Sequence, residues 1–86
     1  MSVPPFDPDL DSAEYVYVRL ADHIEARIRA GELSLARRLP PEREQATEYG
    51  VAYMTVRRAM KVLRERGLIK TVVGRGTYVV EELPAE

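Results

Sequence analysis

Apolar residues recur at helical spacing in three parts of the chain, and β-branched residues gather in a fourth part near its end. In the first part they stand three or four residues apart, at Tyr17, Leu20, Ala21, Ile24 and Ile28. Asp11 and Glu14 have the spacing of a capping box, which places the start of this helix near Asp11 or Ser12. Gly31 is a typical helix end.

Two further helices are expected close together in the middle of the chain. Pro41 suits a first helical position, and Gly50 suits the end of a short second helix. A turn at residues 51–53 leads into a third helix over residues 53–66, which Gly67 closes. The inward positions of this helix follow an i, i+3, i+4, i+7 pattern at Val56, Ala59, Met60 and Leu63.

The connector and the last part of the chain complete the fold. Leu33, Leu35 and Leu39 are expected to enter the core, and residues 37–39 can form a short extended strand. Residues 68–73 and 77–80 are rich in β-branched residues and flank Gly74-Arg75-Gly76, which is typical of a hairpin. The fold class is therefore mainly α with a small β-hairpin: a winged helix-turn-helix with three helices and a two-stranded wing.

Composition limits the organisation and the chemistry. The 86 residues suit one domain over residues 11–80, with a flexible, acidic and proline-rich arm at residues 1–10 and a frayed acidic tail at residues 81–86. The absence of cysteine excludes disulfides and thiolate metal sites, and His23 has no partner at metal-binding spacing. Neither a signal peptide nor a membrane span is expected, and we expect the protein in the cytoplasm.

The net charge of −1 hides an uneven distribution along the chain. Residues 1–33 carry a net charge of −4 and residues 81–86 carry −3, whereas residues 34–80 carry +6. Charges act over a Debye length of roughly 8 Å at physiological salt, so a nearby phosphate responds to the local +6. This asymmetry favours a polyanionic partner.

The outward face of the third helix carries the main candidate residues. Tyr53, Arg57 and Lys61 are spaced at i, i+4 and i+8, so they lie along one face. Arg57 is the first candidate for a base contact, because arginine pairs bidentately with guanine in the major groove. Thr55 and Arg58 flank it and suit phosphate or base contacts. The alternative is an ordinary solvated helix face.

Two further candidates lie outside this helix. Arg43, at the start of the second helix, can reach a phosphate or base, or can instead pair with Glu42 or Glu44. At the hairpin tip, Gly74 and Gly76 permit positive φ and close backbone approach, and Arg75 suits a phosphate or minor-groove contact. The alternative for the glycines is a purely structural turn.

The ordered series of motifs resembles the DNA-binding domain of the GntR (gluconate-repressor-type) family of bacterial transcription regulators. The resemblance runs from about Tyr17 to Val80. Its parts are Leu20-Ala21-Asp22, Ile28 to Leu33, Leu39 to Glu44, Gly50-Val51, Thr55 to Ala59, Gly67 to Ile69 and Gly74 to Val79.

The resemblance implies roles for individual residues. It places DNA contacts on Arg43, on Thr55 and Arg57, and on Gly74, which would enter the minor groove with Arg75 and Gly76 beside it. The family also typically carries a C-terminal domain for ligand sensing and dimerisation, which we expect this regulator to lack. No small-molecule effector site or cofactor is therefore expected.

Three departures from the family pattern stand out. Leu35-Ala36 replaces a common Pro-Gly, and Pro41 replaces a serine that caps the second helix. Ala52-Tyr53 replaces Ser-Arg, which removes a capping hydroxyl and a guanine-reading arginine. We therefore expect a shifted base preference, with Tyr53 contacting a phosphate or a thymine methyl.

The sequence thus predicts a sequence-specific, double-stranded DNA-binding transcriptional regulator that acts as a repressor. A lone domain of this size favours cooperative occupancy of paired half-sites, as a homodimer on DNA. The alternative is a winged helix that binds another protein. A small enzyme is a third hypothesis, but the sequence offers no catalytic arrangement for it.

Overall fold

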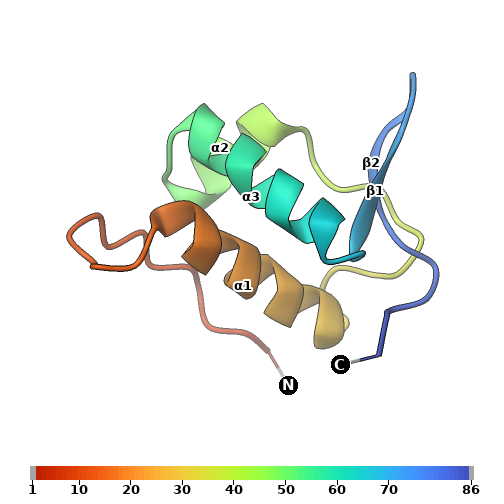
Figure 1. Ribbon diagram of the computed structural model, residues 1–86, viewed down its shortest axis with the longest axis horizontal. Helices are drawn as coiled ribbons and strands as arrows, with labels where there is room; N and C mark the ends of the chain where they lie inside the picture. The colour runs from red at the N-terminus through yellow and green to blue at the C-terminus, as the bar shows by residue number, and fades with distance from the viewer. Residues whose placement is uncertain (1, 86) are drawn as a thin grey trace.

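Three helices and a two-stranded sheet follow one another in the predicted order. The computed structural model describes residues 2–85. Its elements are α1 (Val16–Arg29), α2 (Glu42–Tyr49), α3 (Tyr53–Glu65), β1 (Ile69–Val72) and β2 (Gly76–Val79). The third helix is central, since α1, α2 and β1 all pack against it. In Figure 1, α1 lies below α2 and α3, and the hairpin stands beside them with its turn at the top.

The core forms where the apolar faces of the helices meet. The four inward positions predicted for α3 are all buried, and so are the α1 residues Leu20, Ala21, Ile24 and Ile28. Tyr17 is half-buried at the edge of this cluster. Leu39, Leu68, Ile69 and Val79 extend the core towards the hairpin. The helical periodicity of the sequence therefore predicted these faces correctly.

The first helix begins later than the sequence predicted. It starts at Val16, and the expected start near Asp11 or Ser12 is wrong. The polar side chains of this segment bond to nearby backbone instead: Asp11 N–H donates to Asp9 Oδ1, and Glu14 N–H donates to Ser12 Oγ. Such local bonds compete with helix formation, and so the capping-box spacing did not form a cap.

The turn between α2 and α3 follows the predicted glycine. Gly50 caps α2 in the left-handed conformation with a φ of 68°, and Ala52 precedes α3 without a side-chain cap. Pro41 precedes α2 as its N-cap residue, one position before the first helical residue. Neither helix therefore has a capping hydroxyl, as the departures at these positions predicted.

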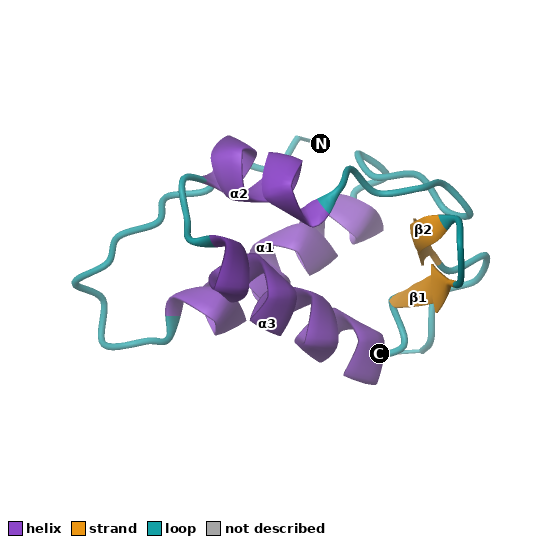
Figure 2. Ribbon diagram, turned by 90° about the horizontal axis from the view of Figure 1, so that it is seen from above, coloured by secondary structure: helices purple, strands orange, loops and turns teal. Residues whose placement is uncertain are grey.

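The wing gains a third, very short strand from the connector. Strands β1 and β2 pair antiparallel from Ile69 opposite Val79 to Val72 opposite Gly76. Arg38 forms a single bridge with Tyr78 on the other edge of β2, so the short strand considered at residues 37–39 is reduced to one paired residue. The connector thereby holds the hairpin against the helical body (Figure 2).

The connector also contains the one strained position among residues 2–85. Leu35 is 43% exposed, so the prediction that it enters the core is wrong. It lies next to Ala36, which has a φ of 63° and is the only described non-glycine residue with positive φ. A left-handed alanine costs about 1–2 kcal/mol.

Replacing Ala36 with glycine is therefore expected to raise the free energy of unfolding by about 0.5–1 kcal/mol. The relief of strain outweighs the extra entropy that glycine gains in the unfolded chain. Urea denaturation measures the change. The control is Ala30→Gly, at a φ of −80°, which should lower stability. A loss of stability in both variants would contradict the prediction.

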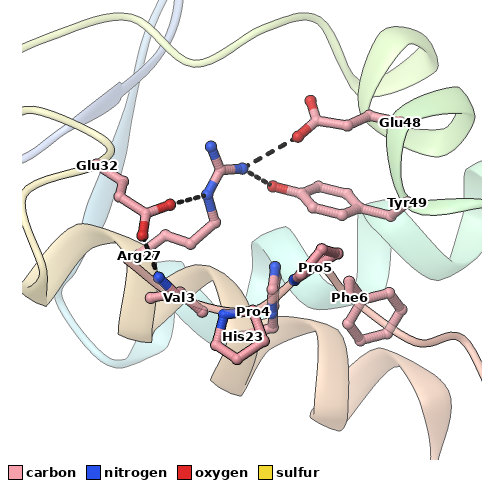
Figure 3. A pocket seen from close by; sticks show the side chains of 9 residues that line it. All are labelled: Val3, Pro4, Pro5, Phe6, His23, Arg27, Glu32, Glu48 and Tyr49. Atoms are coloured by element: carbon pink, nitrogen blue, oxygen red, sulfur yellow. Dashed lines mark hydrogen bonds and ion pairs between the residues drawn. The ribbon is translucent and has the colours of Figure 1, made fainter. Parts of the chain in front are cut away.

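The arm lies on the helical body, which its proline-rich composition did not predict. The guanidinium of Arg19 donates hydrogen bonds to the backbone carbonyls of residues 7–9, over 2.6 to 3.3 Å. The Phe6 ring lies 5.2 Å from the His23 ring and 5.9 Å from the Tyr49 ring (Figure 3). The tail has contacts too, since Leu83 packs against the core.

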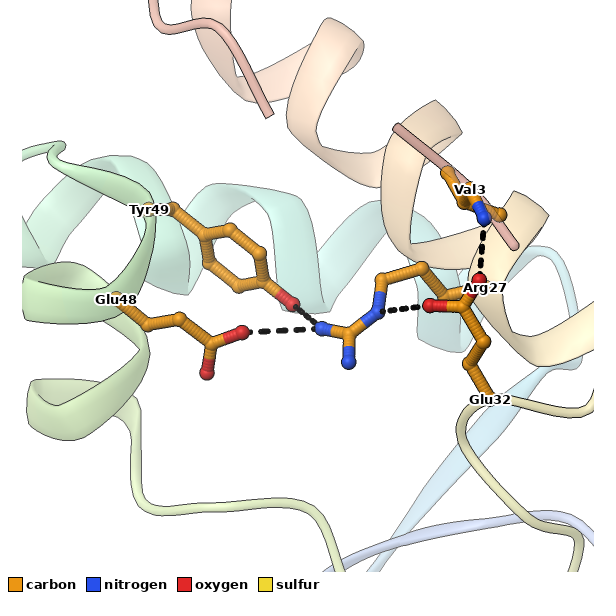
Figure 4. A network of polar contacts seen from close by, with 5 residues as sticks. All are labelled: Val3, Arg27, Glu32, Glu48 and Tyr49. Atoms are coloured by element: carbon orange, nitrogen blue, oxygen red, sulfur yellow. Dashed lines mark hydrogen bonds and ion pairs between the residues drawn. The ribbon is translucent and has the colours of Figure 1, made fainter. Parts of the chain in front are cut away.

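Beneath the arm, one arginine joins α1 to α2. Arg27 donates to the Tyr49 hydroxyl at 2.7 Å, to Glu48 at 3.0 Å and to Glu32 at 3.3 Å (Figure 4). Burial raises the pKa of the Tyr49 hydroxyl, and burial together with the Arg27 charge lowers the pKa of His23. The network positions α2, the first helix of the helix-turn-helix, against α1.

Candidate nucleic-acid interface

The outward face of α3 is arranged as its sequence predicts. Val56, Ala59 and Met60 are fully buried, so the residues between them point away from the core. Arg57, Arg58 and Lys61 are exposed, while Tyr53 and Thr55 are half-buried at the start of the helix.

Two arginines from different helices meet at the ring of Tyr53. The guanidinium carbon of Arg43, on α2, lies 4.5 Å from the ring centre, and that of Arg57 lies 5.9 Å from it. Both distances are within the range of cation–π contacts. Glu42 is 3.9 Å from Arg57 Nε. Arg43 thus contacts Tyr53, and among the described residues it forms no ion pair with Glu42 or Glu44.

Arg58 and Lys61 form a second group on the side of α3 that faces the start of α1. Together with Val62 and Glu65 they line a shallow hollow that Tyr17 closes. Both basic side chains are exposed. The hollow extends the basic surface from the Tyr53 ring along the helix.

The predicted wing tip is an exposed turn. Gly74 has a φ of 78° and Gly76 a φ of 122°, so both need the conformational freedom of glycine. Arg75 is exposed between them, and Val73 beside them is 95% exposed. In Figure 1 the turn projects beyond the helices on the side where α2 begins, opposite α1.

The structure adds Arg38 to the candidate interface. From the sequence, Arg38 contributed only to the net charge of residues 34–80. A Cβ atom on Gly76 would lie 2.9 Å from Arg38 Nε, so the guanidinium lies against the wing next to its tip, where glycine leaves room. Arg38 is exposed. The sequence signal was the short strand at residues 37–39, but its pairing with Tyr78 is a long-range contact that no local pattern specifies.

The structure therefore brings Arg43, Tyr53 and Arg57 into one cluster and keeps the wing tip separate from it. Arg38 and Arg75 give the wing two basic side chains of its own. Within residues 2–85, no group of three or more histidine, cysteine or acidic side chains is arranged to hold a metal ion. The exposed basic surface suits contact with an extended polyanion.

A comparison with known families decides what kind of protein this is. The family model described as "Bacterial regulatory proteins, gntR family" matches residues 16–79. The chain belongs to the gntR family. Among curated members, it is similar to the mannosyl-D-glycerate transport/metabolism system repressor MngR of Escherichia coli K12, with 42% identity over 67 residues. That alignment covers 78% of the chain and 28% of MngR.

Solved structures of gntR-family regulators have the same winged helix-turn-helix fold. The chain is similar to YtrA from Sulfolobus acidocaldarius, a GntR-family transcription factor, with a TM-score of 0.80 and 35% identity. This match covers 95% of the chain and 84% of YtrA. The AraR DNA-binding domain in complex with operator ORX1 matches with a TM-score of 0.73 and 28% identity, covering 93% of the chain and 96% of that domain.

The gntR-family domain described here has short helices. In the part of the chain that the structure describes, none of them has the length and apolar character that crossing a bilayer requires. The longest, α1, has 14 residues and carries charged side chains along its outer face.

Proposed function

We propose that this domain binds double-stranded DNA in a sequence-specific manner and acts as a transcriptional repressor. The observation that carries the proposal is the meeting of Arg43 and Arg57 at the half-buried ring of Tyr53, where α2 and α3 adjoin. Arginine forks recognise guanine edges and phosphates bidentately. A site that presents two of them side by side suits a groove.

The roles follow from the position of each side chain. We assign α3 to the major groove, with Arg57 contacting a base and Thr55 beside it contacting a base or phosphate. Arg43 contacts a base or a phosphate beside Arg57, and Arg58 and Lys61 contact backbone phosphates along the same groove. The wing, with Gly74, Arg75 and Gly76 at its tip, lies over the neighbouring minor groove.

The relatives support this proposal. MngR is a repressor, and the AraR domain that shares this fold was solved with an operator. The chain spans about a quarter of the length of MngR, so what the whole protein senses is a separate matter. We further propose cooperative binding to paired half-sites about one helical turn apart, by two copies of the chain in the cytoplasm.

The test is a titration of a duplex selected from a random library, at several salt concentrations. If Arg58, Lys61 and Arg75 each neutralise a phosphate, log K should fall with log salt at a slope of about −3, or about −4 if Arg43 neutralises one as well. Lys61→Ala should reduce this slope by roughly 1. A flat salt dependence, or a selection that enriches no sequence, would contradict the proposal.

A second measurement separates DNA binding from binding to a protein. Backbone amide shifts in the free and DNA-bound states should move in α3 and at the wing tip. A protein-interaction module would leave these two elements unperturbed by DNA.

A further inference from the structure

Tyr53 lies between two arginines at the point where α2 and α3 adjoin. It is the first residue of α3, it is half-buried, and its ring contacts an arginine from each helix of the helix-turn-helix. Two guanidinium groups repel each other at short range. A neutral aromatic ring lowers this cost, because its negative face attracts both cations.

The contact also leaves the arginines free to bind. A guanidinium that meets an aromatic ring through its face keeps its N–H donors, which lie in the guanidinium plane, for other partners. An arginine loses side-chain entropy when it is fixed on a ligand, and a contact that restricts it beforehand reduces that loss. Arg43 and Arg57 are otherwise exposed and long.

The two contacts are unequal. Arg43 lies 4.5 Å from the ring centre, whereas Arg57 lies 5.9 Å away, near the limit of the interaction. Arg57 has a second restraint in Glu42, at 3.9 Å. The orientation of Arg43 therefore depends on the ring more strongly than that of Arg57.

We propose that Tyr53 is a positioning residue that sets base preference through cation–π contacts with Arg43 and Arg57 that aim both at one groove. This inference rests on the proposed function and names what controls specificity at that site. The hydroxyl of Tyr53 is not needed for this positioning role. The ring itself is, because only an aromatic face attracts cations in this way.

Two substitutions separate the ring from the hydroxyl. Tyr53→Phe keeps the ring, and we expect affinity for the selected duplex to stay within about twofold of the parent. Tyr53→Leu keeps an apolar side chain but removes the ring. We expect about a fivefold to thirtyfold loss of affinity, because the two arginine side chains are then ordered only on binding. Affinity for unrelated duplex DNA should change much less.

The pattern of relaxed preference is the more specific readout. Random-duplex selection with Tyr53→Leu should relax the base positions that Arg43→Ala relaxes, and to a smaller extent those that Arg57→Ala relaxes. In the free protein, the Arg43 side-chain Nε–Hε resonance should lose its ring-current shift in Tyr53→Leu and keep it in Tyr53→Phe. If Tyr53 only stabilised the fold, Tyr53→Leu would change neither the base preference nor the Arg43 Nε–Hε chemical shift.

Controls keep the outcomes distinct. Tyr15→Leu removes an exposed tyrosine from the start of α1, and it should not relax base preference. Thermal unfolding of each variant shows whether the fold is intact. Unchanged preference in Tyr53→Leu, or equal losses in Tyr53→Phe and Tyr53→Leu, would overturn the inference. Failure of the parent chain to bind any duplex would overturn the proposed function instead.

Discussion

Leu63→Ala is expected to lower the free energy of unfolding by about 2–5 kcal/mol. Leu63 is fully buried on α3, in the cluster that also contains core residues of α1 and β1. Truncation removes apolar burial and leaves a cavity that a packed interior fills only in part. Since domains of this size have a total stability of about 5–15 kcal/mol, the variant should be close to unfolding at physiological temperature.

Urea denaturation followed by circular dichroism measures this loss. Met54→Ala is the matched control, because it removes a side chain from the same helix at a position that is 57% exposed. Its cost should stay within about 0.5 kcal/mol. If Leu63→Ala lowered the free energy of unfolding no more than Met54→Ala does, the prediction that Leu63 packs α3 against the other elements would be contradicted.

Arg57→Ala is expected to weaken binding to the selected duplex by about 1–3 kcal/mol and to relax the preference at the base pair it contacts. The guanidinium is 57% exposed on the outward face of α3, so its removal should not unfold the domain. Loss of a bidentate base contact removes discrimination as well as affinity. Random-duplex selection with the variant, together with a titration against the parent site, measures both.

The control for Arg57→Ala is Arg64→Ala, which removes the same charge from an exposed position two turns further along α3. It should weaken binding to all sequences alike, by an electrostatic effect that salt screens. If Arg57→Ala, like Arg64→Ala, lost as much affinity for unrelated DNA as for the selected duplex, Arg57 would be a phosphate contact rather than a base contact.

Periodicity predicted the helices and their buried faces because both depend on residues close together in sequence. In α3, apolar residues spaced three or four apart lie on one side of the helix, independently of the rest of the chain. Gly50 ended α2 for a similar reason, since the conformation that it takes there is open to glycine at little cost. The hairpin around residues 74–76 followed from the same kind of local chemistry.

Local sequence patterns gave wrong predictions where the same residues can adopt more than one local structure. Asp11 and Glu14 have the spacing of a cap, but short polar side chains in that segment satisfied the backbone as turns. Leu35 is as apolar as the buried Leu39, but it lies on the outside of the connector beside a left-handed alanine. The contacts that Arg19 and Phe6 make between the arm and the helices were not predictable from the composition of the arm.

Residue types and their order along the chain were enough to indicate three helices, a wing and a basic outer face. The contacts that define and support the candidate interface come from tertiary packing: Arg43 lies against Tyr53 and Arg38 across Gly76, while Arg27 bonds to Tyr49 and fixes α2 on α1. Each joins side chains that different elements carry, so its geometry depends on how those elements pack and on which rotamers the packing allows. Such information is absent from any single stretch of sequence, because it arises only when the helices and the wing have closed around a common core.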